Sequence, residues 1–385
     1  MSLAAGPGLG PGTRPAAHVR TTGTVRIVGT GLLGASIGLG LRALGVDVVL
    51  HDPSPTARAL ARDLGAGRLP GEDEPEPSLV VVAAPPDVTA DVVADELAAH
   101  PHAVVTDVAS VKGRPLQALL ALGPGMGELL VRYVGGHPLA GRERSGAVAA
   151  RPDLFRGRPW VLTPTSGTDR WAVDRVRDLV LDLGAVPTEM PAQAHDRAVA
   201  RVSHVPQVAA SLVAARLVDA EDDAVSLAGQ GLRDVTRVAA SDTGLWVQIL
   251  GANAGPVADV LSALREDLDS VIAALRSLDQ DADAPGARAA LARSLDAGVR
   301  GRARIPGKHG AAPTSFAVVT VQVPDEPGAL AKILAAMGEA GVNLEDLRLE
   351  HVPDRLVGLA EVSVLPAVKD RLEQVLLAGG WTLAG

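Results

Sequence analysis

Between residues 24 and 187, short Val-rich runs alternate with longer stretches whose apolar residues recur at helical spacing. The runs cover residues 25–29, 46–51, 79–83, 103–106, 131–135 and 160–163, and the helical stretches include 33–44, 55–64, 88–98 and 169–183. A continuous apolar run is typical of a strand buried on both faces, and strands that alternate with helices pair in parallel. This part of the chain therefore predicts a parallel sheet covered by helices.

The pattern changes twice further along the chain. From about residue 192 to residue 297 the strand runs disappear and Leu, Val and Ala recur at helical spacing, which predicts an all-helical domain. Residues 298–313 are basic and Gly-rich without a pattern, as in a linker. Strand runs at 316–323, 343–351 and 356–364, with helical stretches at 328–340 and 366–378, then predict a small α+β module. Any fourth strand must be very short, because the chain ends soon after Trp381.

Composition limits the class of protein. A chain of 385 residues exceeds one ordinary core, so two or three domains are expected. It has no cysteine, which excludes disulfides and thiolate zinc sites, and we expect no metal centre. A net charge of −9 disfavours nucleic-acid binding, and no apolar run reaches the roughly 18 residues that span a membrane. We expect a cytoplasmic protein.

The first 23 residues are rich in Gly, Ala and Pro and lack the apolar core of a signal peptide. We expect a disordered tail; the alternative is a transit peptide, because the segment carries Arg14 and Arg20 and no acidic residue. The expected organisation is a tail (1–23), an α/β domain (24–188), a helical domain (189–297), a linker (298–314) and an α+β domain (315–385).

A glycine-rich turn, Gly29-Thr30-Gly31-Leu32-Leu33-Gly34, follows the first Val-rich run and opens the first helical stretch. In a strand–turn–helix unit Gly29 permits the tight turn, Gly31 lets the backbone approach a pyrophosphate, and Gly34 allows close helix–strand packing. The N–H groups at Leu32 and Leu33 lie at a helix N-terminus, which favours phosphate. The turn predicts a Rossmann-like dinucleotide-binding domain; the alternative is a turn with purely structural glycines.

Asp52 ends the next Val-rich run and bears on the choice of dinucleotide. Its carboxylate is placed to bind the adenosine ribose hydroxyls and to repel a 2′-phosphate, so we predict NAD rather than NADP as the cofactor. Arg58 keeps the alternative open, because a nearby guanidinium accommodates a 2′-phosphate.

Three polar residues follow predicted strands of this domain. His137 comes after Gly135-Gly136, and an imidazole at that edge of the sheet can accept a hydroxyl proton while hydride leaves the same carbon. The alternative is a turn histidine satisfied by backbone. Ser110 either hydrogen-bonds the same site or caps the helix that begins near Lys112. Glu143 either faces the substrate or is an exposed loop charge.

The helical segment contributes further candidates. His195 and His204 are nine residues apart, about 180° around a straight helix, so we expect only one of them to face the site. We select His204 and expect His195 to be a core or capping residue, with Pro206 as a possible cause of a bend. Arg237 shares a helix face with Arg233, and one or both are available to an anionic substrate.

Four motifs together resemble those of the prephenate/arogenate dehydrogenase family of tyrosine biosynthesis. They are Gly-x-Gly-Leu-Leu-Gly-x-Ser from Gly29, Asp-x-x-Ser-Val-Lys from Asp107, Gly-Gly-His-Pro-x-Ala-Gly-x-Glu from Gly135 and Ser-His-x-Pro from Ser203. The resemblance implies that His137 is the catalytic histidine and Ser110 its partner serine. It also implies substrate-binding roles for His204 and Arg237 and places in the pocket for Glu143 and Trp246.

The chemistry that this resemblance implies is the NAD-dependent oxidative decarboxylation of prephenate to 4-hydroxyphenylpyruvate. Hydride passes from the hydroxyl-bearing ring carbon to NAD, His137 takes the hydroxyl proton, and carbon dioxide leaves as the ring becomes aromatic. Many family members carry a histidine where Gln207 stands, so the family's substrate preference does not carry over from this segment. Arogenate, which has an amino group where prephenate has a keto group, remains an alternative substrate. Two other classes stay open: another two-domain oxidoreductase, such as a β-hydroxyacid dehydrogenase, and a non-catalytic sensor of NAD and an amino acid.

The terminal module resembles a second family, the ACT domains. The stretches 323–330 and 341–344 match the loop with which these domains bind an amino acid, and Pro327 suits the first position of a helix. The resemblance implies effector binding, with tyrosine expected as feedback inhibitor, by Glu326, Pro327, Gly328, Ala329, Leu330 and Asn343. The alternative is a module used only for assembly. We expect the Ala- and Leu-rich helical domain to form a homodimer.

Overall fold

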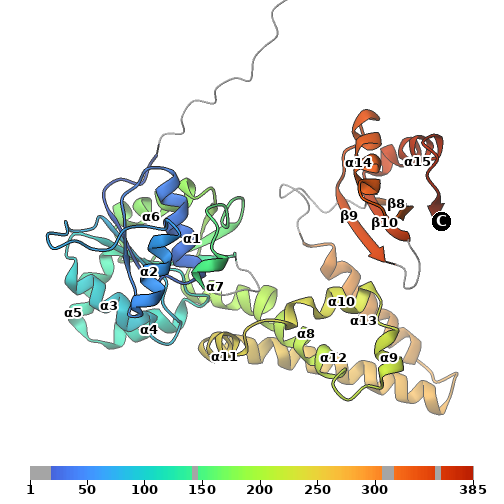
Figure 1. Ribbon diagram of the computed structural model, residues 1–385. Helices are drawn as coiled ribbons and strands as arrows, with labels where there is room; N and C mark the ends of the chain where they lie inside the picture. Colours follow the sequence, from blue (N-terminus) through green and yellow to red (C-terminus); the bar gives the residue numbers. More distant parts are fainter. Residues whose placement is uncertain (1–18, 141–145, 306–315, 352–356, 385) are drawn as a thin grey trace, which may run out of the picture. The chain divides into compact units, whose positions relative to one another are not determined.

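The computed structural model describes residues 19–140, 146–305, 316–351 and 357–384 (Figure 1). Two compact units make up the chain, the first ending at Ala263 and the second beginning at Leu264. The first unit holds the sheet predicted from the Val-rich runs and most of the helices that follow it. The second holds the small α+β module.

A seven-stranded sheet in the order β2-β1-β3-β4-β5-β6-β7 forms the centre of the first unit. Its strands are β1 (Val25–Val28), β2 (Val48–His51), β3 (Leu79–Val82), β4 (Val104–Asp107), β5 (Tyr133–Pro138), β6 (Pro159–Thr163) and β7 (Val186–Glu189). The predicted parallel pairing is confirmed from β2 to β5, but β6 pairs antiparallel with β5. Among the described residues the β5–β6 connection holds only the short helix η2 (Ala147–Ala149), not the α-helix usual in a parallel crossover.

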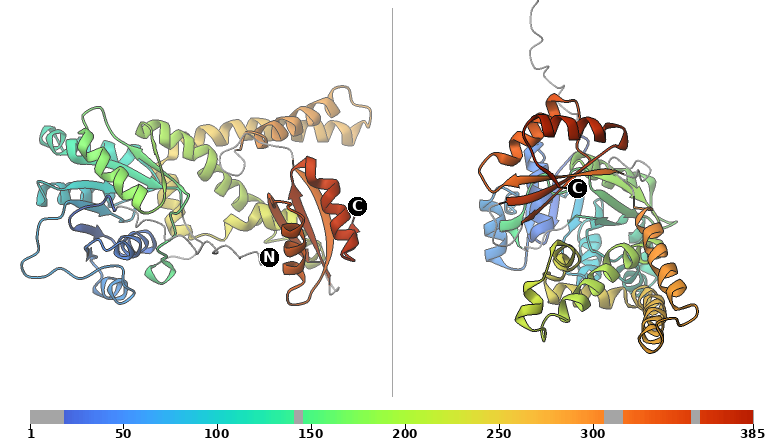
Figure 2. Two further views of the ribbon diagram at one scale, coloured as in Figure 1. Left: turned by 90° about the horizontal axis from the view of Figure 1, so that it is seen from above. Right: turned by 90° about the vertical axis from the view of Figure 1, so that its right-hand side faces the viewer.

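Helices cover both faces of this sheet (Figures 1 and 2). On one face α1 (Leu32–Ala43) and α6 (Arg170–Asp182) pack on β1 and its neighbours through Ile37, Leu41 and Leu179. On the other face α3 (Thr89–Ala99) and α4 (Gly113–Ala121) bury Leu97 and Leu119 against β3 and β4. The remaining helices of this part are α2 (Pro55–Asp63), α5 (Pro124–Leu129) and η1 (Leu130–Arg132).

The region between β7 and the terminal module contains helices and no strand in the described residues, as predicted. It comprises α7 (Ala192–Val199), the π-helix η3 (Ala200–His204), α8 (Val205–Ala215), α9 (Asp222–Ser226), α10 (Gln230–Thr236), η4 (Arg237–Ala239), α11 (Thr243–Ala252), α12 (Ala254–Gln280) and α13 (Ala287–Arg302). No single helix of the described chain is long and apolar enough to cross a membrane; α11 and α12, bent by 94°, meet that test by length and composition only when taken together.

The terminal module is a four-stranded antiparallel sheet in the order β11-β8-β10-β9 with helices packed on it. Its elements are β8 (Ala317–Pro324), α14 (Ala329–Glu339), β9 (Asp346–His351), β10 (Val357–Val364), η6 (Pro366–Val368), α15 (Lys369–Ala378) and β11 (Leu383–Ala384). Alternate residues of β10 are buried, which is the pattern of a sheet with one covered face. The fourth strand, β11, has two residues, so the expectation of a very short strand is confirmed.

Candidate active site

The glycine-rich turn lies at the carboxyl end of β1, and each glycine meets a different constraint. Gly29 has a φ of +100°, and a Cβ there would lie 2.4 Å from the Ala83 carbonyl oxygen. A Cβ on Gly34 would lie 2.0 Å from the Gly29 carbonyl oxygen, so this residue lets α1 pack closely. A Cβ on Gly31 would meet no atom within 4 Å. Gly31 therefore leaves backbone open to a ligand at the helix N-terminus, as a dinucleotide pyrophosphate requires.

Asp52 follows β2 and is held against this turn. Its Oδ2 accepts hydrogen bonds from the N–H and hydroxyl of Thr30 at 2.8 and 2.9 Å, and its Oδ1 accepts one from the Ser54 N–H at 2.9 Å. The carboxylate thus lies beside the glycine-rich turn, where the adenosine ribose of a bound dinucleotide would reach it. Arg58 lies on α2, and its Nε is buried without a hydrogen-bond partner among the described residues. A carboxylate in this place is the feature expected of an NAD site, whereas a nearby guanidinium is a feature of sites that take a 2′-phosphate.

His137 lies near the end of β5 and is only 8% exposed. Its Nδ1 is 2.8 Å from Nε2 of His195, and Nδ1 of His195 is 2.8 Å from Oδ1 of Asp196. The two imidazole rings meet edge to face, with centroids 5.0 Å apart. Burial, with the charges of His195, Lys112 and His204, holds the pKa of His137 well below its usual 6.5.

The hydrogen bonds between His137, His195 and Asp196 determine which nitrogen of each imidazole ring carries a proton. The Asp196 carboxylate accepts hydrogen bonds, so Nδ1 of His195 donates to it and Nε2 of neutral His195 is an acceptor. Nδ1 of His137 therefore donates to His195. The remaining nitrogen of His137, Nε2, is left with a lone pair, which is the state that a general base needs.

The expectation that only one of His195 and His204 faces the site is wrong. Both are buried near His137, because the intervening η3 is a π-helix. A π-turn holds one residue more than an α-turn. Nine residues across it advance like about eight α-helical residues, so the two side chains diverge by roughly 80° instead of about 180°. The sequence shows Pro206 after this turn but gives no periodic signal of the extra residue.

His204 is held by a residue that sequence reasoning missed. The side-chain amide of Asn253, at the break between α11 and α12, donates to the Asp196 carbonyl oxygen at 2.8 Å and lies 3.1 Å from Nδ1 of His204. With Nδ1 as the acceptor, neutral His204 carries its proton on Nε2 and can donate it to a substrate. Burial lowers the pKa of His204 to about 4. Trp246 meets the His204 ring at 84°, with centroids 6.0 Å apart.

A buried ion pair supports the strand that carries His137. The Lys112 ammonium binds Oδ1 of Asp107 and donates to the Gly136 carbonyl oxygen at 2.6 Å. Oδ2 of Asp107 accepts from the Tyr133 hydroxyl at 2.6 Å. Burial lowers the pKa of Lys112, although the negative charge of Asp107 acts to raise it. Burial raises the pKa of the Tyr133 hydroxyl. The motif from Asp107 to Lys112 is visible in the sequence, but its internal ion pair is not.

The other predicted site residues differ in their burial and in where they lie. Ser110 lies in the loop after β4 and is half-buried. It does not cap α4, because Asp196 accepts hydrogen bonds from the Lys112 and Gly113 N–H groups at 2.8 and 2.7 Å instead. Arg237 opens η4 and is exposed. Glu143 lies outside the described residues.

The predicted effector loop joins β8 to α14. Gly328 is the N-cap of α14 with a φ of +86°, and a Cβ there would meet no atom within 4 Å. The helix begins at Ala329, so Pro327 precedes its first turn and the expectation that it opens the helix is wrong. Asn343 donates to Oε1 of Glu345 at 3.1 Å. Glu326 and Leu330 flank the same turn.

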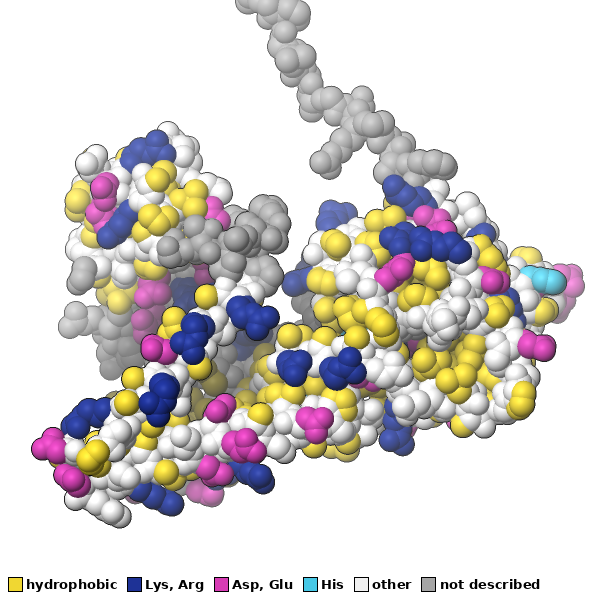
Figure 3. Space-filling model, turned by 180° about the vertical axis from the view of Figure 1, so that it is seen from behind, with side chains coloured by type: hydrophobic (Ala, Val, Ile, Leu, Met, Phe, Trp, Pro, Cys, Tyr) yellow, Lys and Arg dark blue, Asp and Glu magenta, His cyan; other side chains and the backbone are white. Residues whose placement is uncertain are grey.

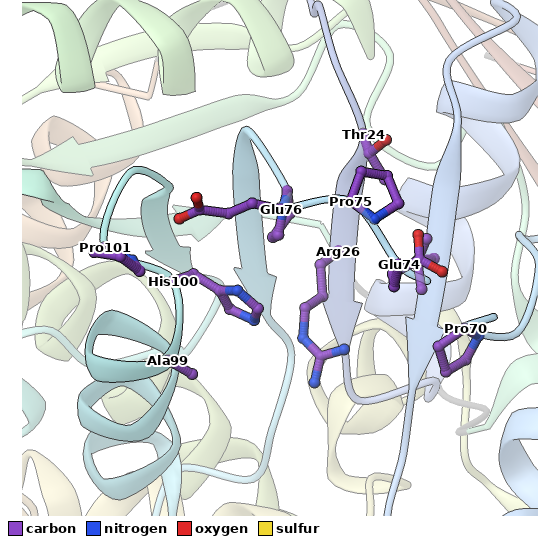
Figure 4. A pocket seen from close by; sticks show the side chains of 11 residues that line it. Thr24, Arg26, Pro70, Glu74, Pro75, Glu76, Ala99, His100 and Pro101 are labelled. Atoms are coloured by element: carbon purple, nitrogen blue, oxygen red, sulfur yellow. The ribbon is translucent and has the colours of Figure 1, made fainter. Parts of the chain in front are cut away.

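Two cavities of the first unit lie at different edges of the sheet, and one of them borders the site. One, of about 390 Å³, lies by the amino ends of β1 and β3, the edge opposite the glycine turn (Figure 4). Its Arg26 pairs with Glu96 and its Glu74 pairs with Arg68, so these charges are already matched. The other cavity, of about 660 Å³, is lined by Asp196 and Asn253 among others. It therefore borders the hydrogen-bonded groups His137, His195 and Asp196. Ligands of such folds bind at carboxyl ends of strands, which favours the histidine side over the first cavity.

Comparisons with known families cover most of the chain. Residues 37–189 match the prephenate dehydrogenase nucleotide-binding domain, and residues 191–291 match the prephenate dehydrogenase dimerization domain. Residues 317–376 match the ACT domain.

Individual relatives agree with these matches. A probable prephenate dehydrogenase of Streptomyces niveus, NovF, is 40% identical over 362 residues, covering 93% of this chain and 98% of NovF. Prephenate dehydrogenase from Aquifex aeolicus, in complex with hydroxyphenyl propionate and NAD+, has a TM-score of 0.62 at 27% identity, covering 74% of this chain and 98% of that one. Synechocystis arogenate dehydrogenase has a TM-score of 0.57 at 27% identity, covering 72% and 99%.

Proposed function

The chain belongs to the prephenate dehydrogenase family, and on that premise we propose that it catalyses the NAD-dependent oxidative decarboxylation of prephenate to 4-hydroxyphenylpyruvate. One observation carries the proposal. The buried His137 is held by His195 in the tautomer whose Nε2 is free to accept a proton. It lies near the carboxyl end of β5, in the sheet whose β1 leads into the glycine turn.

The glycine turn and Asp52 fit a dinucleotide. The open backbone at Gly31 and the N-terminus of α1 would hold the pyrophosphate, and Asp52 would accept hydrogen bonds from the adenosine ribose. Bound NAD supplies the hydride acceptor, as it does in the family's chemistry. The protein then has to place the substrate, take one proton and exclude competing reactions.

The substrate residues divide this work. His137 takes the ring hydroxyl proton at Nε2, and Ser110 hydrogen-bonds the same hydroxyl. His204 donates its Nε2 proton to a substrate carboxylate as a neutral group. Arg237 supplies a positive charge for the dianion, with Glu143 and Trp246 completing the pocket. Carbon dioxide leaves as the ring becomes aromatic, which makes the step effectively irreversible.

Arogenate is the second candidate substrate, favoured by the likeness in fold to the Synechocystis arogenate dehydrogenase. Steady-state kinetics with both substrates and both cofactors separates the possibilities. We expect kcat/KM to be at least about tenfold higher for prephenate with NAD than for any other pair. A preference for arogenate would refute the substrate assignment. Binding of NAD without turnover of either substrate would favour the sensor reading.

A homodimer is the proposed assembly, formed through the dimerization-domain region. Large apolar side chains are exposed there in helices and turns of the first unit, and Figure 3 shows yellow side chains at many places on the molecular surface. They include Val202, Leu212, Val218, Leu227 and Val247. So many exposed apolar groups are typical of a surface that a second copy covers. Light scattering should give twice 39.3 kDa, and a monomer at micromolar concentration would contradict the assembly. A cytoplasmic location is part of the same proposal.

Feedback inhibition by tyrosine is proposed for the ACT module. Gly328 keeps the β8–α14 turn open to a ligand, and Asn343 offers an amide. A variant lacking residues 315–385 should keep its turnover and lose tyrosine inhibition, because allostery needs an effector that prefers one state. Asn343→Ala in the full chain should also weaken inhibition by tyrosine. Equal, competitive inhibition of the truncated and full chains would instead locate tyrosine at the catalytic site.

A further inference from the structure

A continuous row of hydrogen bonds leads from His137 through His195 to Asp196 and into the backbone. The row has two 2.8 Å contacts between side chains and ends at the N–H groups of Lys112 and Gly113, the start of α4. All three side chains are buried: His137 is 8%, His195 1% and Asp196 7% exposed. The proton on each ring is fixed by the carboxylate at the far end of the row.

Two local features of the fold allow this row to exist. The π-helix η3 turns both His195 and His204 toward the site. Gly113 lets Asp196 approach, because a Cβ there would lie 2.6 Å from Oδ2 of Asp196. The carboxylate therefore caps α4 and orients His195 at once, with its position set from two elements.

We propose that His195, and not His137, carries the positive charge after the substrate has given up its hydroxyl proton. The proposal rests on the proposed function. As the substrate O–H bond breaks, its proton bonds to Nε2 of His137; the Nδ1–H bond of His137 breaks, and that proton bonds to Nε2 of His195. His195 then holds protons on both nitrogens beside the Asp196 carboxylate, and His137 is neutral. After product release the protons move back, and one leaves from Nε2 of His137 to water.

The surroundings favour a charge on His195 over one on His137. A charge on His137 would be buried and would face Lys112, the N-cap of α4, and His204 from η3, with Asp107 already bound to Lys112. A charge on His195 adjoins a carboxylate at 2.8 Å. Burial works to raise the pKa of Asp196, but hydrogen bonds from His195 and two backbone N–H groups outweigh it and hold that pKa below its usual value. Asp196 is thus ionised when His195 needs it.

His195 and Asp196 are positioning residues in this scheme, since they act through His137. His195→Gln separates orientation from proton transfer, because the Gln Oε1 can still accept from Nδ1 of His137 but cannot take its proton. We expect kcat to fall about 100-fold, with the substrate KM and the NAD Kd within about twofold of the unmodified enzyme. The acid limb of the kcat profile should move to lower pH, because His137 alone is the weaker base.

His102→Gln is the matched control, since it makes the same change at an exposed histidine on the opposite edge of the sheet. It should leave kcat and the acid limb unchanged. A His195→Gln enzyme with near-normal kcat would overturn the proposal. So would a lower kcat with an unmoved acid limb, which is the behaviour of a purely structural residue.

A second measurement needs no turnover. In the full chain labelled with ¹⁵N-histidine, both His137 and His195 should be Nδ1–H tautomers at high pH, and the first proton added to this pair should be found on Nε2 of His195. Protonation of His137 first would overturn the proposal. An enzyme that oxidises neither prephenate nor arogenate but shows the expected titration would refute only the proposed function.

Discussion

The buried pair of Lys112 and Asp107 offers a direct test of how the strand bearing His137 is supported. The Lys112 side chain is 1% exposed and that of Asp107 is fully buried. Lys112→Met keeps most of the buried stem and removes the charge. The carboxylate then loses its cation, and the Gly136 carbonyl loses a donor at 2.6 Å. The perturbation is therefore electrostatic rather than a cavity.

The size of the effect follows from what remains around Asp107. Breaking a buried ion pair from one side costs about 3–5 kcal/mol, because the other charge is left uncompensated. Asp107 would keep the Tyr133 hydroxyl at 2.6 Å and the Ala109 N–H at 2.8 Å. Two remaining donors place the loss at the lower end, about 3 kcal/mol. Asp107→Asn added to Lys112→Met removes the stranded charge and keeps an acceptor, so the double variant should recover about half of that loss.

Urea unfolding followed by tryptophan fluorescence measures both variants. In a Trp381→Phe background the remaining tryptophans, Trp160, Trp171 and Trp246, all lie in the unit that ends at Ala263. The signal then reports on one unit, which avoids averaging over two transitions. A single variant within about 0.5 kcal/mol of the parent would refute the reasoning, since that is the range of ordinary surface changes. A double variant less stable than the single one would refute the compensation.

Three other outcomes concern the cofactor, the catalytic roles and acid stability. Asp52→Ser should narrow the kcat/KM preference for NAD over NADP, because the carboxylate that repels a 2′-phosphate is gone; equal efficiency in the unmodified enzyme would contradict the role. His137→Asn should lower kcat by about 100-fold or more with KM little changed, whereas Arg237→Gln should mainly raise KM. Near-normal turnover by the His137 variant would exclude it as the base. His204 should cost stability in acid: its folded pKa of about 4 lies below an unfolded value near 6.5, so the unfolded chain binds more protons as pH falls through this window. The difference corresponds to about 3 kcal/mol lost by pH 4, and His204→Gln should flatten the fall in urea midpoint between pH 6.5 and 4. An unchanged fall would count against it.

The fold was largely predictable because buried strands have recognisable patterns of apolar residues. The Val-rich runs of the first unit are strands buried on both faces, and β10 shows the alternation of a one-sided sheet. β7 was not predicted, since Val186–Glu189 is mostly exposed and contains Pro187, which an edge strand tolerates. The reversed β6 also escaped prediction, because strand direction depends on the connection and not on the residues of the strand.

The site was predictable only where a residue's chemistry and its place at the end of a strand coincide. His137 and the glycine turn meet both conditions. Asn253 does not, since it lies at a break between two helices and acts through contacts with Asp196 and His204. Asp196 is adjacent to His195 in the sequence, but its role in capping α4 joins residues that are far apart along the chain. Such pairings exist only after the tertiary fold has formed.

The failure at His195 has a specific physical cause. Angular arguments from sequence assume about 100° per residue, and they hold only while every turn is an α-turn. One additional residue in η3 shifts the phase by about that amount, which is enough to move a histidine from the far side of a helix to the site. Because π-turns carry no composition that marks them, spacing alone cannot place side chains on opposite sides of one. Inserting one alanine after Val202, which is 70% exposed, adds about 100° between His195 and His204 and should turn one of them away from the site. If the chain still folds, the insertion should lower kcat/KM, and an insertion variant with normal kcat/KM would show that the helical phase across η3 is not what brings both histidines to the site.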